Sequence, residues 1–364
     1  MPKRTAADSS SPSCELVLSD LHHRITGVSA SIRALLPQLN DRYHLMFLAR
    51  RPQGDIPAQS LWAGFREMAR APVGRPFRIW HVRRNNEMFW GIVARDILRL
   101  PVKLVFTSAA IRRHSWYPRQ LIARMDAVIA TSDRAAVCLT EVAAVVPHGV
   151  DIKRFELGDG SSEKSQAQPW CRFSVRLGIV GRVRPEKGTD LFVEALCATL
   201  PNHPQACAII AGKVTSKYQS FARRLKQQLA SAGVLDRVFF LDEVAADDMP
   251  LLYSQLDIVC APARYEGFGL VPIEAMVSGT AVIASRTGAY EAMVEDGGTG
   301  YLVELESSSQ VADAVERLLS SPDELQSMKQ SGCQKVRDQF SLDNEVAGIS
   351  RVYEAMWHQG ARGG

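Results

Sequence analysis

The chain of 364 residues is too long for one ordinary core and suits two domains of roughly 100–200 residues each. With 46% hydrophobic and 23% charged residues, it has the composition of a globular protein, and no low-complexity tract predicts long disorder. The net charge is only +4, and no basic-aromatic motif of a known nucleic-acid module is present, which argues against nucleic acid as a partner.

The same sequence argues against a membrane span, a zinc site and a disulfide framework. No apolar run reaches the roughly 18 residues that a spanning helix needs, and residues 1–13 lack the apolar core of a secretory signal, so we expect a disordered tail there. The seven cysteines are scattered and form no C-x-x-C pair, which favours a reducing cytoplasm. We therefore expect a cytoplasmic protein without a bound metal.

Charge is divided unevenly along the chain. Residues 1–165 hold 24 Lys+Arg against 15 Asp+Glu, whereas the remainder holds 19 against 24. The basic residues of the first half are mostly arginine, which suits bidentate contact with carboxylate or phosphate. A solvated basic surface is the other interpretation of this excess.

The first half alternates short apolar runs with amphipathic stretches. Helical patterns cover residues 28–39 and 87–98. Apolar runs too short for helices and bounded by turn residues are typical of a parallel sheet buried on both faces. Strands are predicted at residues 15–19, 43–49, 78–81, 103–107, 127–130 and 144–146.

A second series of the same kind follows a break at residues 147–151 (P-H-G-V-D) and a polar, Gly/Ser-rich linker candidate at 158–168. Two βαβ series in tandem predict an α/β protein with two doubly wound, Rossmann-like domains facing a cleft, residues 14–165 and 166–340. Ligands of such sheets bind beyond the carboxyl ends of the strands. The second series has strands at 175–180, 207–211, 238–241, 258–261 and 281–284, and helices at 189–200, 218–232, 249–254, 271–278, 310–319 and 324–340.

The segment G-R-V-R-P-E-K-G at residues 181–188 joins a predicted buried strand to a predicted helix. Its two terminal glycines permit tight turns and close backbone approach. Arg182 and Lys187 would project toward the start of the helix, where anions are already favoured, and would stabilise charge developing on a leaving nucleoside diphosphate. A surface loop with incidental charges is the alternative, because neither the Walker A nor the G-x-G-x-x-G spacing is present.

The segment R-Y-E-G-F-G-L-V-P-I-E-A-M at residues 264–276 is the strongest signal in the sequence. Its two glycines predict a tight turn, and Pro272 suits the first turn of a helix. Free amides of the turn could face an anion, supported by the helix dipole. Glu266 and Glu274 could then bracket one ligand and accept hydrogen bonds from its hydroxyl groups. A helix-capping role would explain Glu274 alone, and a glycosidase-like acid/base pair has no further support in the sequence.

The pattern G-R-x-x-x-E-K-G followed by E-G-F-G-x-x-x-x-E resembles the GT-B-fold glycosyltransferases of family 4, the retaining glycosyl transferases of group 1. Residues 239–241, 281–285 and 296–300 are similar to the family as well, and 147–151 resemble its N-G-V-D linker. The resemblance is strong over 171–305 and thinner in the first half. It implies the GT-B fold, with a C-terminal helix at 341–364 that returns to the N-terminal domain.

The resemblance also implies a role for each matching position. Arg182 and Lys187 would hold the donor diphosphate. Glu266 would contact the transferred sugar, and Glu274 would contact the ribose hydroxyls. The amides that would meet the phosphates belong to Gly267, Phe268, Gly269 and Leu270.

Two positions in the first half match the family less closely. Gly27 corresponds loosely to a glycine of the family's first loop, with Thr26 in place of the usual first glycine. Many members carry a histidine at the end of the strand predicted at 103–107, and this chain has none there. His114 is the candidate catalytic substitute; an acceptor contact and an exposed loop histidine are the other interpretations.

Residues 83–88 (R-R-N-N-E-M) and 112–116 (R-R-H-S-W) resemble mannosyltransferases of bacterial lipopolysaccharide core assembly. That resemblance implies transfer of mannose from GDP-mannose, as co-substrate and without a cofactor, to an anionic, Kdo-bearing inner core. The arginine excess agrees with an anionic glycolipid acceptor. Peripheral contact of this basic face with anionic headgroups of the inner membrane is the alternative. The candidate acceptor-binding residues are Arg83, Arg84, Arg112 and Arg113.

The expected reaction keeps the configuration of the anomeric carbon. The departing phosphate can itself accept the proton of the acceptor hydroxyl, so no dedicated protein base is required, in keeping with the lack of an evident catalytic triad or carboxylate cage. A family member with another donor and acceptor, a sugar-nucleotide epimerase or phosphorylase, and a non-catalytic nucleotide-sugar-binding scaffold are the alternatives.

Overall fold

The structure, a computed structural model, describes residues 13–23, 27–156 and 168–362. The chain divides into two compact units, Met1–Pro147 with Asp343–Gly364, and His148–Leu342. The predicted boundary at 165/166 therefore falls too late. Val150 exchanges backbone hydrogen bonds with Phe340 and Leu342, which ties the segment after Pro147 to the second unit. The tail expected at 1–13 and the linker expected at 158–168 lie almost entirely outside the described residues.

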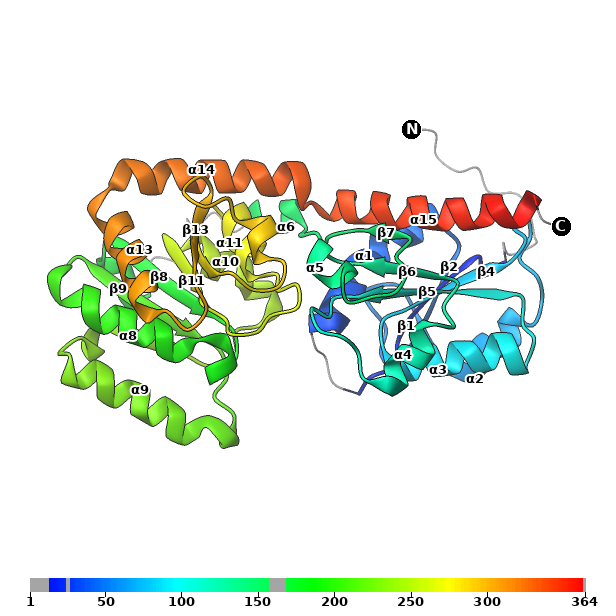
Figure 1. Cartoon of the computed structure of the whole chain (residues 1–364), viewed down its shortest axis with the longest axis horizontal. Helices are drawn as coiled ribbons and strands as arrows, with labels where there is room; N and C mark the ends of the chain where they lie inside the picture. The colour runs from blue at the N-terminus through cyan, green and yellow to red at the C-terminus, as the bar shows by residue number, and fades with distance from the viewer. Residues whose placement is uncertain (1–12, 24–26, 157–167, 363–364) are drawn as a thin grey trace. The chain divides into compact units, whose positions relative to one another are not determined.

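The first unit is built on a parallel sheet whose order, among the described residues, is β3-β2-β1-β4-β5-β6-β7. The chain winds outward from β1 in one direction and from β4 in the other, so the topological switch point lies between these two strands. Helices cover both faces of this sheet (Figure 1). The strands are β1 (Leu16–Asp20), β2 (Leu45–Ala49), β3 (Ala58–Gln59), β4 (Arg78–Val82), β5 (Val102–Ser108), β6 (Ala127–Ala130) and β7 (Ala144–Val145).

The helices of the first unit differ most from the predicted ones where they are short. The helix predicted at 87–98 ends as a regular α-helix at Ile92 and continues as a π-helical turn, Val93–Ile97. Three short helices were not predicted, because segments of four to eight residues carry too little periodicity. The helices are α1 (Gly27–Arg42), α2 (Leu61–Met68), α3 (Asn85–Ile92), α4 (Trp116–Ile122), α5 (Asp133–Ala136) and α15 (Leu342–Arg362).

The last helix, α15, packs on the first unit, as predicted. The indole of Trp357 donates to the carbonyl of Phe77 at 2.9 Å, and the Tyr353 hydroxyl is hydrogen-bonded to the buried His81 of β4. Arg75 binds both carboxylate oxygens of Glu354. No helix in the described part of the chain combines the length and the apolar character needed to cross a bilayer.

The second unit repeats the doubly wound plan with the order β10-β9-β8-β11-β12-β13 among its described residues. Its switch point lies between β8 and β11. The strands are β8 (Val175–Val180), β9 (Ala206–Ala211), β10 (Val238–Leu241), β11 (Ile258–Ala261), β12 (Ala281–Ser285) and β13 (Gly300–Val303). The helices are α6 (Ile152–Glu156), α8 (Thr189–Thr199), α9 (Gln219–Ser231), α10 (Met249–Ser254), α11 (Val271–Val277), α12 (Tyr290–Met293), α13 (Ser308–Ser320) and α14 (Pro322–Gln339).

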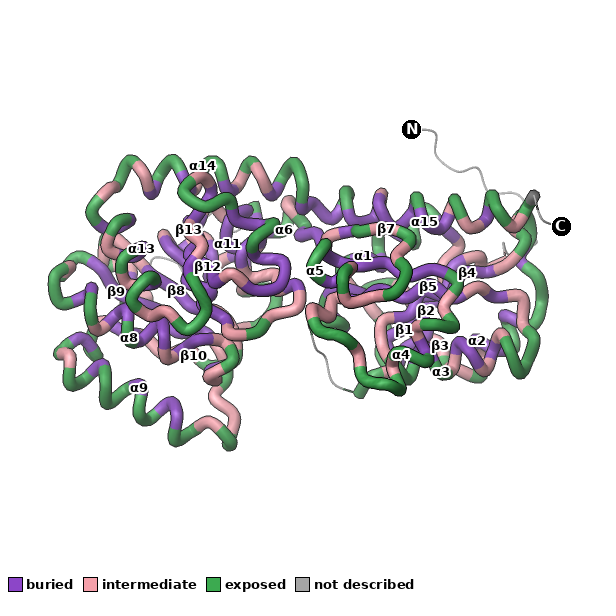
Figure 2. The backbone as a smooth tube through the Cα atoms, in the orientation of Figure 1, coloured by how far each residue is buried: buried purple, intermediate pink, exposed green. Residues whose placement is uncertain are grey.

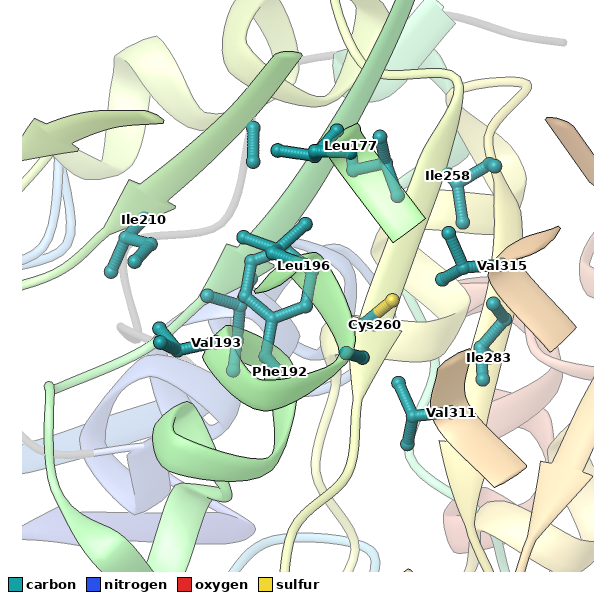
Figure 3. Close-up of a cluster of buried hydrophobic side chains, with 14 of the residues drawn as sticks. Leu177, Phe192, Val193, Leu196, Ile210, Ile258, Cys260, Ile283, Val311 and Val315 are labelled. Atoms are coloured by element: carbon teal, nitrogen blue, oxygen red, sulfur yellow. The ribbon is translucent and has the colours of Figure 1, made fainter. Parts of the chain in front are cut away.

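The core of the second unit holds its strand ends in place. Aliphatic side chains of the sheet, such as Leu177 and Ile258, lie against Phe192 and Leu196 of α8 (Figure 3). The strands are buried along most of their length, whereas several of the loops that follow them are partly exposed (Figure 2). Since the strands β8 and β11 are adjacent and parallel, the loops at their carboxyl ends are neighbours.

Candidate active site

The loop after β8 is shaped by the glycines at its two ends. Gly181 has a φ of 135° and Gly188 a φ of 71°, which are conformations that other residues rarely adopt. A Cβ added to Gly188 would collide with the carbonyl oxygen of Pro262, so the end of this loop lies directly against the loop after β11. Between the two glycines, a 3-10 turn, Pro185–Lys187, forms the last part of the loop before Gly188.

Arg264 fixes the contact between these two loops. Its guanidinium donates to both carboxylate oxygens of Asp190, at 2.7 and 2.9 Å, and to Glu306 at 2.7 Å. Its backbone amide donates to the carbonyl of Glu186 at 3.1 Å. Arg264 is therefore a positioning residue that the sequence pattern did not single out, since its partners are far apart along the chain.

The two sequence motifs meet in an ion pair between Lys187 and Glu266. The Lys187 ammonium donates to Glu266 Oε2 across 79 positions of sequence, and the amide of Gly267 donates to Oε1 at 3.2 Å. Each of the paired side chains is about one-fifth exposed, so the pair is reachable from solvent. Arg182 is exposed and makes no hydrogen bond or ion pair with the described residues. The loops beyond the adjacent β8 and β11 thus carry Arg182, which has no partner among the described residues, and the Lys187–Glu266 ion pair.

The glycine turn after Glu266 leaves backbone donors unused. Gly269 has a φ of 69°, and within the described residues the amides of Phe268, Gly269 and Leu270 donate to no protein acceptor. The Phe268 ring is buried edge-on against His148, with 4.9 Å between the ring centroids. Because α11 has only two turns, these amides rather than a long helix dipole are what the turn offers to an anion.

Glu274 lies in the first turn of α11 and accepts a hydrogen bond from the buried hydroxyl of Tyr253 at 2.9 Å. Desolvation raises the pKa of Glu274, and the Tyr253 hydrogen bond and the charges of Arg154 and Lys187 oppose that rise. Because its carboxylate has a side-chain partner and feels the charge of Lys187, helix capping is not a sufficient explanation for this glutamate. Tyr253 is a second residue that the sequence reasoning missed.

In the first unit, His114 lies in the loop after β5, six residues beyond the last residue of the strand, and its role as a substitute for the family histidine stays a prediction. Its Nε2 is 3.2 Å from the hydroxyl oxygen of Ser108, the last residue of the strand. Burial and the charge of Arg112 lower the pKa of His114, which favours the neutral form of the ring. A cavity of about 620 Å³ is lined by Arg113, His114 and residues of α4 and β6. Arg112 and Arg113 are both exposed.

The other two arginines expected to read an acceptor have internal carboxylate partners. Arg84 binds Asp20 and lies 3.6 Å from Glu87, which is fully buried. Arg83 lies 3.6 Å from the buried Glu345 of α15. Both side chains are mostly buried, so they stabilise the first unit, and their contact with an acceptor stays a prediction.

Gly27 is the first residue of α1 and is exposed. A Cβ added to it would meet no atom within 4 Å, so packing alone does not require a glycine there. Its expected role in donor binding stays a prediction. No cluster of three His, Cys, Asp or Glu side chains suited to a metal ion occurs among the described residues.

The sequence profile of the family described as "Glycosyl transferases group 1" matches residues 174–335, which include both loops of the site. The chain is 38% identical to the lipopolysaccharide core biosynthesis mannosyltransferase LpcC of Rhizobium leguminosarum bv. viciae, over 94% of this chain and 96% of the relative. The chain belongs to the glycosyl transferases of group 1. This glycosyltransferase is also 36% identical to the lipopolysaccharide core biosynthesis mannosyltransferase LpsB of Rhizobium meliloti (strain 1021), over 94% of this chain and 97% of the relative.

The fold of this glycosyltransferase resembles the crystal structure of Anabaena HepE in complex with UDP and glucose. The TM-score is 0.78 at 19% identity, and the similarity covers 94% of this chain and 100% of the other. The predicted family and the predicted GT-B fold of two Rossmann-like domains are thereby confirmed.

Proposed function

We propose that this glycosyltransferase moves mannose from GDP-mannose, with retention of the anomeric configuration, onto an anionic, Kdo-type inner core of lipopolysaccharide. The observation that carries the proposal is the contact between Lys187 and Glu266, which brings a cation of one sequence motif and a carboxylate of the other together on adjacent loops. The mannose and lipopolysaccharide parts rest on two relatives with similarity over nearly the full chain, both named lipopolysaccharide core biosynthesis mannosyltransferases.

The donor diphosphate is bound by the loops of the second unit. Arg182 and Lys187 neutralise the negative charge that grows on the departing diphosphate, and the free amides of the glycine turn donate to its oxygens. Glu266 accepts hydrogen bonds from hydroxyls of the hexose, and Glu274 accepts them from the ribose. The acceptor hydroxyl attacks from the face that the diphosphate leaves, and its proton passes to a diphosphate oxygen.

The anionic acceptor is bound by the first unit. Arg112 and Arg113 are exposed cations beside His114, and Arg113 and His114 line the cavity of about 620 Å³. Guanidinium groups suit the carboxylates and phosphates of an inner-core glycolipid. On the neighbouring helix, Trp116 and Tyr117 are 72% and 48% exposed, which supports peripheral contact with the cytoplasmic face of the inner membrane.

The test is a donor screen with the purified full-length protein. GDP-mannose, other GDP-sugars, UDP-sugars and ADP-sugars are each incubated with deacylated inner-core oligosaccharide, and release of the nucleoside diphosphate is measured. We expect acceptor-dependent release from GDP-mannose, and an α-linked product by NMR coupling constants. Turnover of a UDP-sugar in preference to GDP-mannose would refute the donor assignment. Tight binding without release would instead support a non-catalytic scaffold.

A further inference from the structure

Tyr290, the first residue of α12, has a buried ring and a hydroxyl without a partner among the described residues. Its side chain is 1% exposed, and the hydroxyl makes no hydrogen bond with the described residues. The hydroxyl is not among the fully buried side-chain atoms that lack a partner in the described part of the chain, so its oxygen is open to a hydrogen-bond partner from outside the protein. A ligand bound at this place could supply that partner.

The hydroxyl of Tyr290 lies directly against the glycine turn of the candidate active site. A Cβ added to Gly269 would lie 2.8 Å from the Tyr290 hydroxyl oxygen and 2.5 Å from Cγ of Glu266. A Cβ added to Gly288 would collide with the carbonyl oxygens of Glu266 and Gly267. The segment around Gly288 and Tyr290 thus packs directly against the glycine turn. A side chain at Gly269 or Gly288 would block this close contact.

Two tyrosines with buried rings therefore lie near the two glutamates, and only one of them is hydrogen-bonded to a glutamate. Tyr253 already donates to Glu274, whereas the Tyr290 hydroxyl is close enough to feel the charges of both Glu266 and Glu274 but bonds to neither. Burial, followed by those two charges, raises the pKa of Tyr290 well above its ordinary value, so the hydroxyl keeps its proton and can act as a donor at any working pH.

We propose that the Tyr290 hydroxyl donates a hydrogen bond to a diphosphate oxygen of the bound sugar nucleotide, and that Tyr253 is a positioning residue that orients Glu274 toward the ribose. The proposal rests on the proposed function of this site. The diphosphate is the expected acceptor because the hydroxyl borders the turn at Phe268, Gly269 and Leu270, whose amides donate to no acceptor among the described residues. A neutral donor there adds a contact to the diphosphate beside the two cations, without adding charge.

Binding calorimetry with ligands that contain successively more of the donor shows which part of the donor each tyrosine contacts. Tyr290→Phe and Tyr253→Phe each remove one hydroxyl from a buried ring, and Tyr301→Phe is the matched control, since Tyr301 donates to Glu324 away from the turn. The probes are GMP, GDP and GDP-mannose, with UMP, UDP and UDP-glucose run in parallel. Thermal melting verifies that each variant is folded.

We expect Tyr290→Phe to weaken GDP and GDP-mannose by about 10- to 100-fold, the range for a lost hydrogen bond to a charged group, and to leave GMP nearly unchanged. Tyr253→Phe should weaken all three guanine ligands through the ribose, and should raise the KM for the donor without changing kcat. Tyr301→Phe should match the wild type. Because the Tyr253 hydrogen bond lowers the pKa of Glu274, its loss should also move the acid limb of donor affinity to higher pH.

Equal affinities of wild type and Tyr290→Phe for the diphosphate would overturn the assignment of Tyr290. So would a loss confined to GDP-mannose, because the hydroxyl would then contact the hexose. A wild-type protein that binds neither nucleotide series would refute the proposed function itself, and that outcome is seen before any variant is made.

Discussion

Arginines follow a central strand in both units, but they are exposed in one unit and mostly buried beside carboxylates in the other. After β8, Arg182 is exposed and without a partner among the described residues. After β4, Arg83 and Arg84 are mostly buried and face the carboxylates of Glu345 and Asp20. A free guanidinium can bind a ligand, whereas a buried pair has already used its charge inside the fold. The environment of an arginine, more than its place after a strand, therefore decides what it does.

The largest effect that would test this comparison is on stability. Arg84→Met should lower the free energy of unfolding by about 3–5 kcal/mol, because it leaves the buried Asp20 without its partner and Glu87 with a weaker one. Urea unfolding of the variant measures the loss, with Arg66→Met, an exposed arginine of α2, as the control. A stable variant that fails only with the anionic acceptor would show that Arg84 binds the acceptor after all.

Next in size is the loss of activity in Lys187→Met. Removing a cation that stabilises the departing diphosphate should lower kcat/KM about 10²- to 10³-fold, measured as release of nucleoside diphosphate. Lys226→Met, on the exposed face of α9, should retain full activity. Turnover within a factor of two of the wild type would contradict the role of the pair with Glu266.

How far the sequence could predict these sites depends on how local their determinants are. The turn at Gly267 and Gly269 and the cations at Arg182 and Lys187 lie within short motifs, so their spacing was sufficient to place them on two loops. The partners of Arg84 could not be found that way, because Asp20 is far from it in sequence and only the pairing of β1 with β4 brings the two strand ends together.

The difference between local patterns and long-range contacts also explains which strands were predicted correctly and which residues were missed. The strands β8, β10 and β11 were predicted with their observed bounds, since buried apolar runs between turn residues carry a strong local signal. Tyr253 and Tyr290 were missed, because the sequence pattern of a tyrosine in a helix predicts only a core residue. The position of its hydroxyl beside a glutamate is known only from the structure. The division after Pro147 was also not predicted, since it depends on the hydrogen bond between Val150 and Phe340, which are far apart in the sequence.

Arg182→Ala tests the exposed arginine that follows β8. Because the guanidinium is exposed and unpaired with any described residue, its removal should leave the melting temperature unchanged and lower kcat/KM about 10- to 100-fold, as for a lost charge-assisted hydrogen bond. Arg223→Ala, an exposed arginine of α9, is the matched control. A clear drop in melting temperature would mean that Arg182 has a structural partner, as Arg84 has.

The smallest expected effect concerns His114. Replacing it with Ala should lower acceptor-dependent transfer about 2- to 10-fold, the cost of one neutral hydrogen bond, and leave donor binding unchanged. Burial and Arg112 lower the pKa of His114 below 6.5, so activity that needs the neutral ring should fall only as the pH drops below that value. Arg112→Ala removes a repelling charge, which raises the pKa and should shift this acid limb to higher pH. A limb that does not move in Arg112→Ala, or that persists in His114→Ala, would assign the titration to another group and leave His114 as a loop residue.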